Sequence, residues 1–240
     1  MYLGGKTRVA RHIAEQIAQR RGARQTYVEP FLGSAAVASR VAPTFDRALL
    51  SDASPDLMLM WQALQDGWAP PTSLSEPEWR TLRDAAPSAL RGFAGFPCSF
   101  GGKWFGGYAR DPKGGRNFAA SAARSVTSRA ATIAHADLRL GDYRAIADAI
   151  DPTDTVIYAD PPYSGTTAYG AVAPFDTAEF WDTARGWADS GVLVLVSEYA
   201  APDDWRPVWS RETPVTLAKA NHLPDGRLRT AVESLYVVAA

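Results

Sequence analysis

The sequence predicts an α/β fold, with a mostly parallel sheet covered by helices on both faces and a smaller lobe inserted into it. Apolar, strand-like runs alternate with helical patterns along most of the chain, and one glycine-rich, basic segment interrupts this alternation. A chain of 240 residues is long enough for one large domain with an inserted lobe. Hydrophobic residues make up 46% and charged residues 21%, which is typical of a globular protein.

The strands and helices are predicted as follows. Short apolar runs predict strands at residues 25–29, 47–51, 137–140, 155–159 and 192–197, and two closing strands at 206–213 and 232–238. Helices are predicted at 6–20, 35–41, 55–66, 76–86 and 177–188, with a further one running from Tyr143 to residue 150. Another helix begins at Asn117 or Ser121 and reaches towards residue 134. Such alternation indicates a parallel sheet between two layers of helices.

The segment 92–116 differs in amino-acid composition from the rest of the chain. It holds eight of the 19 glycines and the aromatic residues Phe93, Phe96, Phe100, Trp104, Phe105 and Tyr108. With little regular periodicity, it is predicted to be rich in loops. The four later aromatic residues could stack on a ligand or form a small hydrophobic core of their own.

Charge is distributed unevenly. Residues 79–130 contain nine basic and two acidic residues, a net charge of +7, whereas the rest of the chain has a net charge of −8. An acidic body with one basic segment indicates a local surface for phosphate groups. A solvated basic face without a partner is the alternative.

Composition also excludes several classes of protein. A single cysteine, Cys98, excludes an internal disulfide framework and favours a reducing compartment, so we expect a cytoplasmic protein. The chain does not open with a signal-peptide pattern, and its longest apolar run, 192–196, is too short to span a membrane. The three histidines and one cysteine show no zinc-like spacing, and no metal site is predicted.

The most informative motif is Asp160-Pro161-Pro162-Tyr163, directly after the apolar run 155–159. Proline fixes φ and lacks an N–H, so the motif cannot extend the sheet and forms a rigid edge. The carboxyl ends of strands are where open α/β sheets bind ligands. An ordinary Pro-Pro turn with a solvated aspartate is the alternative.

Two other predicted strand ends also carry acids, Glu29 and Asp52. After Glu29, the turn at Gly33 lets the backbone approach a ligand closely and opens a helix whose N–H groups can donate, which suits a nucleotide or sulfonium cofactor. A generic α/β turn is the alternative. Asp52 could accept ribose hydroxyls, or it could simply cap a helix. Near the N-terminus, Tyr2-Leu3-Gly4-Gly5-Lys6 suits a carboxylate, or forms a flexible start.

The order of these segments resembles the Dam-like DNA adenine-N6 methyltransferase family. Tyr-x-Gly-Gly-Lys (2–6) is followed by Glu-Pro-Phe-x-Gly-Ser (29–34), Asp52, the basic segment, Gly-Asp-Tyr (141–143) and Asp-Pro-Pro-Tyr (160–163), and residues 230–235 resemble the family's closing strand. The turn Gly33-Ser34-Ala35 has fewer glycines than this family often carries.

The resemblance implies a Rossmann-like, S-adenosylmethionine (AdoMet)-dependent catalytic domain over residues 1–56 and 131–240. It also implies an inserted, mainly helical and loop, target-recognition lobe over 57–130. AdoMet would be the cofactor. The partner would be DNA, which we expect to be duplex, and the protein would act as a monomer without a membrane or an obligate protein partner.

The site residues that the resemblance implies fall into three groups. Tyr2, Gly5 and Lys6 would flank the methionine part of AdoMet, with Glu29, Pro30, Phe31 and Gly33 beneath the cofactor, Asp52 at the ribose, Asp142 and Tyr143 at the adenine, and Asp160 beside it. Asp160, Pro161, Pro162 and Tyr163 would form the catalytic motif. Lys103, Arg110, Lys113 and Arg116 would contact DNA.

Asp160 and the Pro161 carbonyl would accept the two hydrogens of a target adenine's amine, and Tyr163 would stack on the flipped base. The loop 164–170 could close over that base. Four alternatives stay open: a cytosine-amine methyltransferase, which more often carries Ser-Pro-Pro-Tyr; a protein-glutamine methyltransferase, with Asn in place of Asp160; a small-molecule AdoMet enzyme; and a non-catalytic DNA-binding protein on a methylase scaffold.

Overall fold

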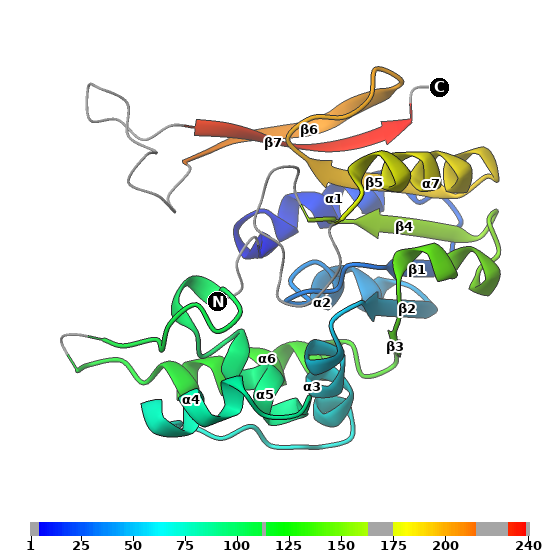
Figure 1. Cartoon of the computed structure of the whole chain (residues 1–240). Coiled ribbons are helices and arrows are strands. Elements are labelled where there is room, and N and C mark those ends of the chain that lie inside the picture. The colour runs from blue at the N-terminus through cyan, green and yellow to red at the C-terminus, as the bar shows by residue number, and fades with distance from the viewer. Residues whose placement is uncertain (1–4, 112–113, 163–174, 215–229, 239–240) are drawn as a thin grey trace, which may run out of the picture.

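A seven-stranded sheet forms the centre of the computed structural model, which describes residues 5–111, 114–162, 175–214 and 230–238 (Figure 1). Its strand order is β3-β2-β1-β4-β5-β7-β6. The strands are β1 (Thr26–Glu29), β2 (Arg47–Asp52), β3 (Asp137–Leu140), β4 (Thr155–Ala159), β5 (Leu193–Glu198), β6 (Trp205–Pro214) and β7 (Thr230–Val238).

Strands β1 to β5 pair in parallel, and β7 pairs antiparallel with both β5 and β6. This order is that of a doubly wound sheet, with β7 inserted between β5 and β6. The predicted α/β class with a mostly parallel sheet is therefore confirmed, and an antiparallel hairpin closes the sheet.

Alternate residues of the strands face two separate hydrophobic cores. Tyr27, Leu50, Tyr158 and Leu195 face the first core, together with α1 (Ala10–Arg20) and α2 (Ala38–Val41). Their neighbours Val28, Leu49, Ile157 and Val194 face the second core, with α7 (Thr177–Asp189) and the 3₁₀ helix η4 (Tyr143–Ala149). Because side chains alternate along a strand, fully apolar strands of this kind require helices on both faces.

Four further helices pack against the first core and against one another (Figure 1). They are α3 (Pro55–Gln65), α4 (Glu76–Arg83), α5 (Ala89–Gly95) and α6 (Phe118–Thr132). Ser75 and Glu78 form a capping box at the start of α4, and Asn117 Oδ1 accepts from Ala120 N (2.9 Å) at the start of α6. Helix α6 therefore begins at the first of the two predicted positions.

Helix α5 lies in part within the segment predicted to be rich in loops, and this prediction was wrong for residues 92–95. A Cβ atom on Gly92 would lie 2.2 Å from the backbone oxygen of Asp56, and one on Gly95 would lie 2.1 Å from the Trp104 ring. These two glycines therefore allow close packing of α5 against its neighbours instead of flexibility.

Two other predicted helices differ in detail. The helix predicted at 35–41 begins only at Ala38, since Ala35 adopts a positive φ of 54°. The helix predicted after Tyr143 is of the 3₁₀ type. Short 3₁₀ segments also occur in η1 (Lys6–Arg8), η2 (Ala42–Thr44) and η3 (Phe100–Gly102). Within the described ranges, no helix is long and apolar enough to cross a membrane.

Candidate functional site

Four acidic residues lie at the carboxyl ends of four adjacent strands. Glu29 ends β1 and Asp52 ends β2, while Asp142 and Asp160 follow β3 and β4 by two residues and one residue. The pairing places Glu29 beside Leu50 and Asp52 beside Leu140, so these ends lie at one edge of the sheet. The structure thus brings together predicted residues that are up to 131 positions apart in the sequence.

Asp160 is held by a buried lysine. Lys6 Nζ lies 2.6 Å from Asp160 Oδ1 and 3.3 Å from Glu233 Oε1, and the lysine is only 6% exposed. Burial by itself would lower the pKa of Lys6, but the two carboxylates outweigh it, and the pKa is raised. The ammonium therefore stays charged and joins the predicted catalytic motif to strand β7.

Glu29 is a buried carboxyl group beside a buried phenol. Tyr27 Oη donates to Glu29 Oε2 at 2.6 Å. Burial raises the pKa of Glu29 well above its usual range, although the Tyr27 hydrogen bond opposes the shift, and the negative charges of Asp160 and Asp52 add to it. The raised pKa favours the protonated form of Glu29 at the centre of the edge. The Tyr158 hydroxyl, which contacts Ser197 Oγ at 2.9 Å, lies near enough to interact electrostatically with Glu29.

Asp52 organises the predicted cofactor turn. Its Oδ2 accepts from Gly33 N and its Oδ1 from Ser54 N, both at 3.0 Å, and Trp61 Nε1 donates to the Gly33 carbonyl at 3.0 Å. Ser54, and not Asp52, occupies the N-cap position of α3. Gly33 (φ 48°) and Ala35 (φ 54°) both adopt left-handed conformations, so the turn is tight even though Ala35 replaces a possible glycine.

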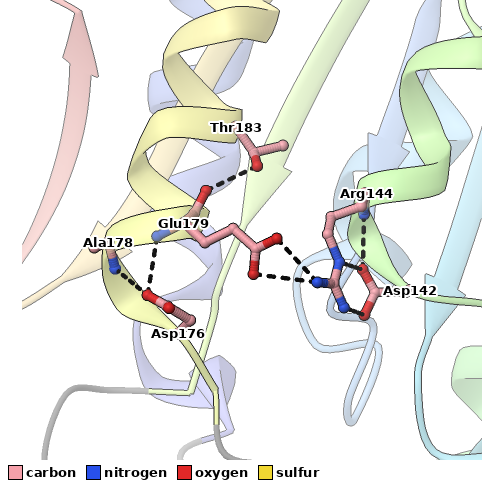
Figure 2. A network of polar contacts seen from close by, with 6 residues as sticks. All are labelled: Asp142, Arg144, Asp176, Ala178, Glu179 and Thr183. Carbon is pink, nitrogen blue, oxygen red and sulfur yellow. Dashed lines mark hydrogen bonds and ion pairs between the residues drawn. The ribbon is translucent and has the colours of Figure 1, made fainter.

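Asp142 belongs to a surface network that reaches across to α7 (Figure 2). Arg144 Nε and Nη2 donate to the two Asp142 oxygens at 2.7 and 2.9 Å, and Arg144 Nη1 donates to Glu179 at 3.0 and 3.1 Å. The hydrogen bond from Arg144 lowers the pKa of Asp142. Asp176 caps α7 in the same network by accepting from Ala178 N and Glu179 N. The Asp142 carboxylate is therefore charged and held in one orientation.

Phe31 and Tyr143 lie in one aromatic cluster below the edge. Their ring centroids are 5.4 Å apart, and both contact Phe175 and Phe180. Tyr143 is buried and Phe31 half-buried. The cluster packs the segments that follow β1 and β3 against α7.

The remaining predicted residues vary in how far the structure describes them. Pro30 and Pro161 are buried, and Gly5 and Pro162 are half-buried. Tyr2, Lys113, Tyr163 and the loop 164–170 lie outside the described residues. The predicted DNA contacts Lys103, Arg110 and Arg116 are exposed, and Arg110 is paired with Glu76, to which its Nε donates at 3.0 Å.

The aromatic residues of the basic segment divide into two groups. Trp104, Phe105 and Tyr108 pack against the first core, and Tyr108 Oη donates to the Leu74 carbonyl at 2.5 Å. Phe100 is 69% exposed. Three of these side chains therefore serve as core, and only Phe100 stands at the surface.

Three residues of the site had no role in the sequence prediction: Tyr27, Tyr158 and Glu233. The two tyrosines each lie two positions before a predicted site acid, and this spacing puts both on the same face of a strand. That pattern is a signal in the sequence. Glu233 reaches Lys6 only because β7 is inserted beside β5.

Comparisons with known proteins agree with the resemblance over part of the chain. No curated protein matches the sequence. Among solved structures, an Escherichia coli protein assigned as a methyltransferase is 13% identical, with 97% of this chain and 85% of that chain covered and a TM-score of 0.40. A Haemophilus influenzae protein assigned as a methylase (10%, 97% and 89%, 0.41) and a Pyrococcus horikoshii protein assigned as an RNA methyltransferase (6%, 97% and 85%, 0.42) are similar at the same level.

The family match covers the first three motifs of the chain. The predicted Tyr-x-Gly-Gly-Lys, Glu-Pro-Phe-x-Gly-Ser and Asp52 segments lie within it, and Asp160 lies beyond it. Over residues 2–88, the chain matches the family of D12 class N6 adenine-specific DNA methyltransferases, as the sequence resemblance predicted.

Proposed function

We propose that this protein transfers a methyl group from AdoMet to the exocyclic amine of adenine in DNA. The observation that carries the proposal is the position of Asp160, one residue beyond β4 and 2.6 Å from the buried Lys6 ammonium, on the edge that also holds Glu29, Asp52 and Asp142. The family match over residues 2–88 supports this reading.

The residues at this edge fit a cationic, nucleoside-containing cofactor. Four acidic residues lie at the edge, where the Lys6 ammonium pairs with Asp160 and Arg144 pairs with Asp142, and the tight turn at Gly33 leaves backbone close to the edge. AdoMet, when bound, supplies a methyl group activated by a sulfonium. Asp52 would accept from its ribose and Asp142 from its adenine amine, with Glu29, Phe31 and Tyr143 beneath. Gly5 and Lys6 would lie near its methionine part.

Asp160 and the Pro161 carbonyl would act on the target amine. The lone pair of an adenine amine is delocalised into the ring, so the amine is a poor nucleophile. Two acceptors, one for each hydrogen, would favour a tetrahedral nitrogen whose lone pair points at the methyl group. Lys6 would keep Asp160 ionised and oriented, so the gain comes from positioning and electrostatics. The extra proton would leave the product nitrogen afterwards, to solvent.

DNA must present its base outside the helix, since the amine is unreachable within a duplex. Tyr163 would stack on that base. The exposed Lys103 and Arg116 would contact DNA, with Lys113, while Arg110 would first have to leave Glu76. Residues 57–130 would form the recognition lobe.

The test is methyl transfer from labelled AdoMet to unmethylated duplex DNA, followed by nucleoside analysis. We expect methyladenine from the wild type and a loss of roughly 10²–10³-fold or more in Asp160→Ala. Asp84→Asn, which alters an exposed acid of the lobe, is the control with full activity. Methylcytosine would overturn the adenine assignment, and DNA binding without transfer would favour the non-catalytic alternative.

A further inference from the structure

A hollow separate from the strand-end edge lies between η1, α2 and α6. Its volume is about 250 Å³, and Ala36 and six polar residues line it. The polar residues are Thr7, Ser39, Arg40, Ser128, Arg129 and Thr132. Two guanidinium groups and four hydroxyl groups therefore share one small recess, which we name the Arg40–Arg129 hollow.

The hollow carries positive charge without a nearby acid. Arg129 Nη1 donates to the Ser34 carbonyl at 2.6 Å and Nη2 donates to Thr7 Oγ1 at 3.1 Å, and neither acceptor is charged. Burial lowers the pKa of Arg129, and the positive charge of Arg40 lowers it further. Among the residues that the structure describes, no carboxylate lies within ion-pair distance of either arginine.

Both arginines lie in the last turn of a helix, but this position does not explain why two like charges share one recess. Arg129 lies in the last turn of α6, where a cation complements the helix dipole, and it ties the cofactor turn to η1. Arg40 is exposed, and its charge makes the recess less favourable for the partly buried Arg129. Two like charges that share a recess repel each other less when an anion lies between them.

The donors suit a phosphate group. Guanidinium groups present parallel N–H donors that match phosphate oxygens, and Thr7 Oγ1, which accepts from Arg129, keeps its own proton to donate. We propose that the Arg40–Arg129 hollow binds a phosphate group. Its source would be the DNA backbone, and this second part rests on the proposed function.

The position of the hollow supports that source. Thr7 directly follows Lys6, and Ser34 directly follows Gly33, so Arg129 contacts the two segments that begin the predicted site. Thr7 and Arg40 belong to the predicted catalytic domain, and Ser128 and Arg129 to the predicted recognition lobe. A backbone phosphate here would therefore contact residues of both the catalytic domain and the recognition lobe.

The first arm of the test uses inorganic phosphate. The unfolding temperature of the full chain is measured against phosphate concentration at constant ionic strength, for the wild type, Arg40→Gln and Arg206→Gln. Arg206 is an exposed arginine on β6, so it gives the same change of charge elsewhere. We expect phosphate to stabilise the wild type and Arg206→Gln but not Arg40→Gln. Equal phosphate responses in all three would overturn the site.

The second arm measures duplex DNA affinity against salt concentration, without methyl transfer. We expect Arg40→Gln to reduce the slope of log affinity against log salt by about 0.9, the value for one phosphate contact, and Arg206→Gln to leave it unchanged. A lost phosphate response with an unchanged slope would overturn the DNA source and assign the hollow to a free or small-molecule phosphate. Absence of DNA binding by the wild type would overturn the proposed function, while the phosphate arm still decides the site.

Discussion

The strand-end edge and the helices α3–α6 hold their charged groups in opposite ways. At the edge, the Lys6 ammonium is buried between Asp160 and Glu233. In the helices, Arg80 and Arg110 both pair with Glu76 while remaining largely exposed. Exposed pairs contribute little because water screens them, whereas breaking a buried pair strands a charge in the interior. The edge therefore keeps its charges in the interior, where losing one partner costs more than it does in an exposed pair.

A buried pair within the helices refines this contrast. Arg91 Nη1 donates to Asp56 Oδ2 at 2.6 Å, and Arg91 also donates to the carbonyls of Leu82 and Arg83. Asp56 in turn accepts from Ser88 N at 3.0 Å. Both side chains form these hydrogen bonds within the protein, and the pair connects α5 to α3. At the edge, by contrast, the buried Lys6 ammonium lies between two acids, Asp160 and Glu233.

Replacing the central cation of the edge has the largest expected effect. Lys6→Met leaves Asp160 and Glu233 facing each other, and we expect a loss of about 3–5 kcal/mol in unfolding free energy. That corresponds to roughly 10 °C in Tm. Methyl transfer should also fall by about 10²-fold, since Asp160 loses its orienting partner.

Arg110→Met is the matched control, because it removes a cation from an exposed pair. Its Tm, measured by calorimetry alongside Lys6→Met, should equal that of the wild type. Equal losses in the two variants would show that the buried and exposed pairs do not differ in the way proposed.

A glycine in the helical region comes next in expected size. Gly92→Ala would place its Cβ 2.2 Å from the Asp56 carbonyl oxygen, so α5 must move away from α3. We expect a loss of about 1–3 kcal/mol from this overpacking. Gly186→Ala is the control within α7, where a Cβ meets nothing within 4 Å. Better helix propensity should make that variant more stable by about 1 kcal/mol. Denaturant unfolding of both variants decides, and similar values would contradict the packing role of Gly92.

The last prediction concerns the pH dependence that Glu29 causes, whose size is set for each pH unit. Its pKa is raised in the folded state, so its contribution to stability is complete below the unfolded pKa of about 4.3 and is lost as the pH rises through the folded pKa. Glu29→Gln keeps an acceptor for Tyr27 but does not titrate.

We therefore expect the variant to gain stability relative to the wild type as the pH rises, by up to about 1.4 kcal/mol per pH unit within that window. Urea unfolding from pH 4 to pH 9 measures this difference. A constant difference across the range would mean that Glu29 is ionised in the folded protein.

The strand ends show how much of the site local sequence determines. Each strand of the predicted sheet is found within two residues of its expected limits, because short apolar runs and their flanking acids are local signals. Parallel pairing then brings Glu29, Asp52, Asp142 and Asp160 to one edge, which follows from the alternation of strands and helices alone. The family resemblance likewise depended on local motifs, and it is confirmed over residues 2–88.

Contacts between distant segments could not be predicted in this way. Whether Gly92 ends a helix or allows close packing depends on the carbonyl of Asp56, 36 positions earlier. Likewise, Trp104, Phe105 and Tyr108 could stack on a ligand or form a core, and only their packing against the first core decided between the two.

The amino-acid sequence by itself therefore determined the strands, most of the helices and the acids at the strand ends, because these depend on neighbours along the chain. Only the tertiary structure decided which charges meet. Lys6 pairs with Asp160 and Glu233 because β7 lies beside β5, and Arg129 reaches Thr7 and Ser34 because α6 packs beside η1 and α2. The energy of a charge depends on burial and on its spatial neighbours, and the local sequence specifies neither of them.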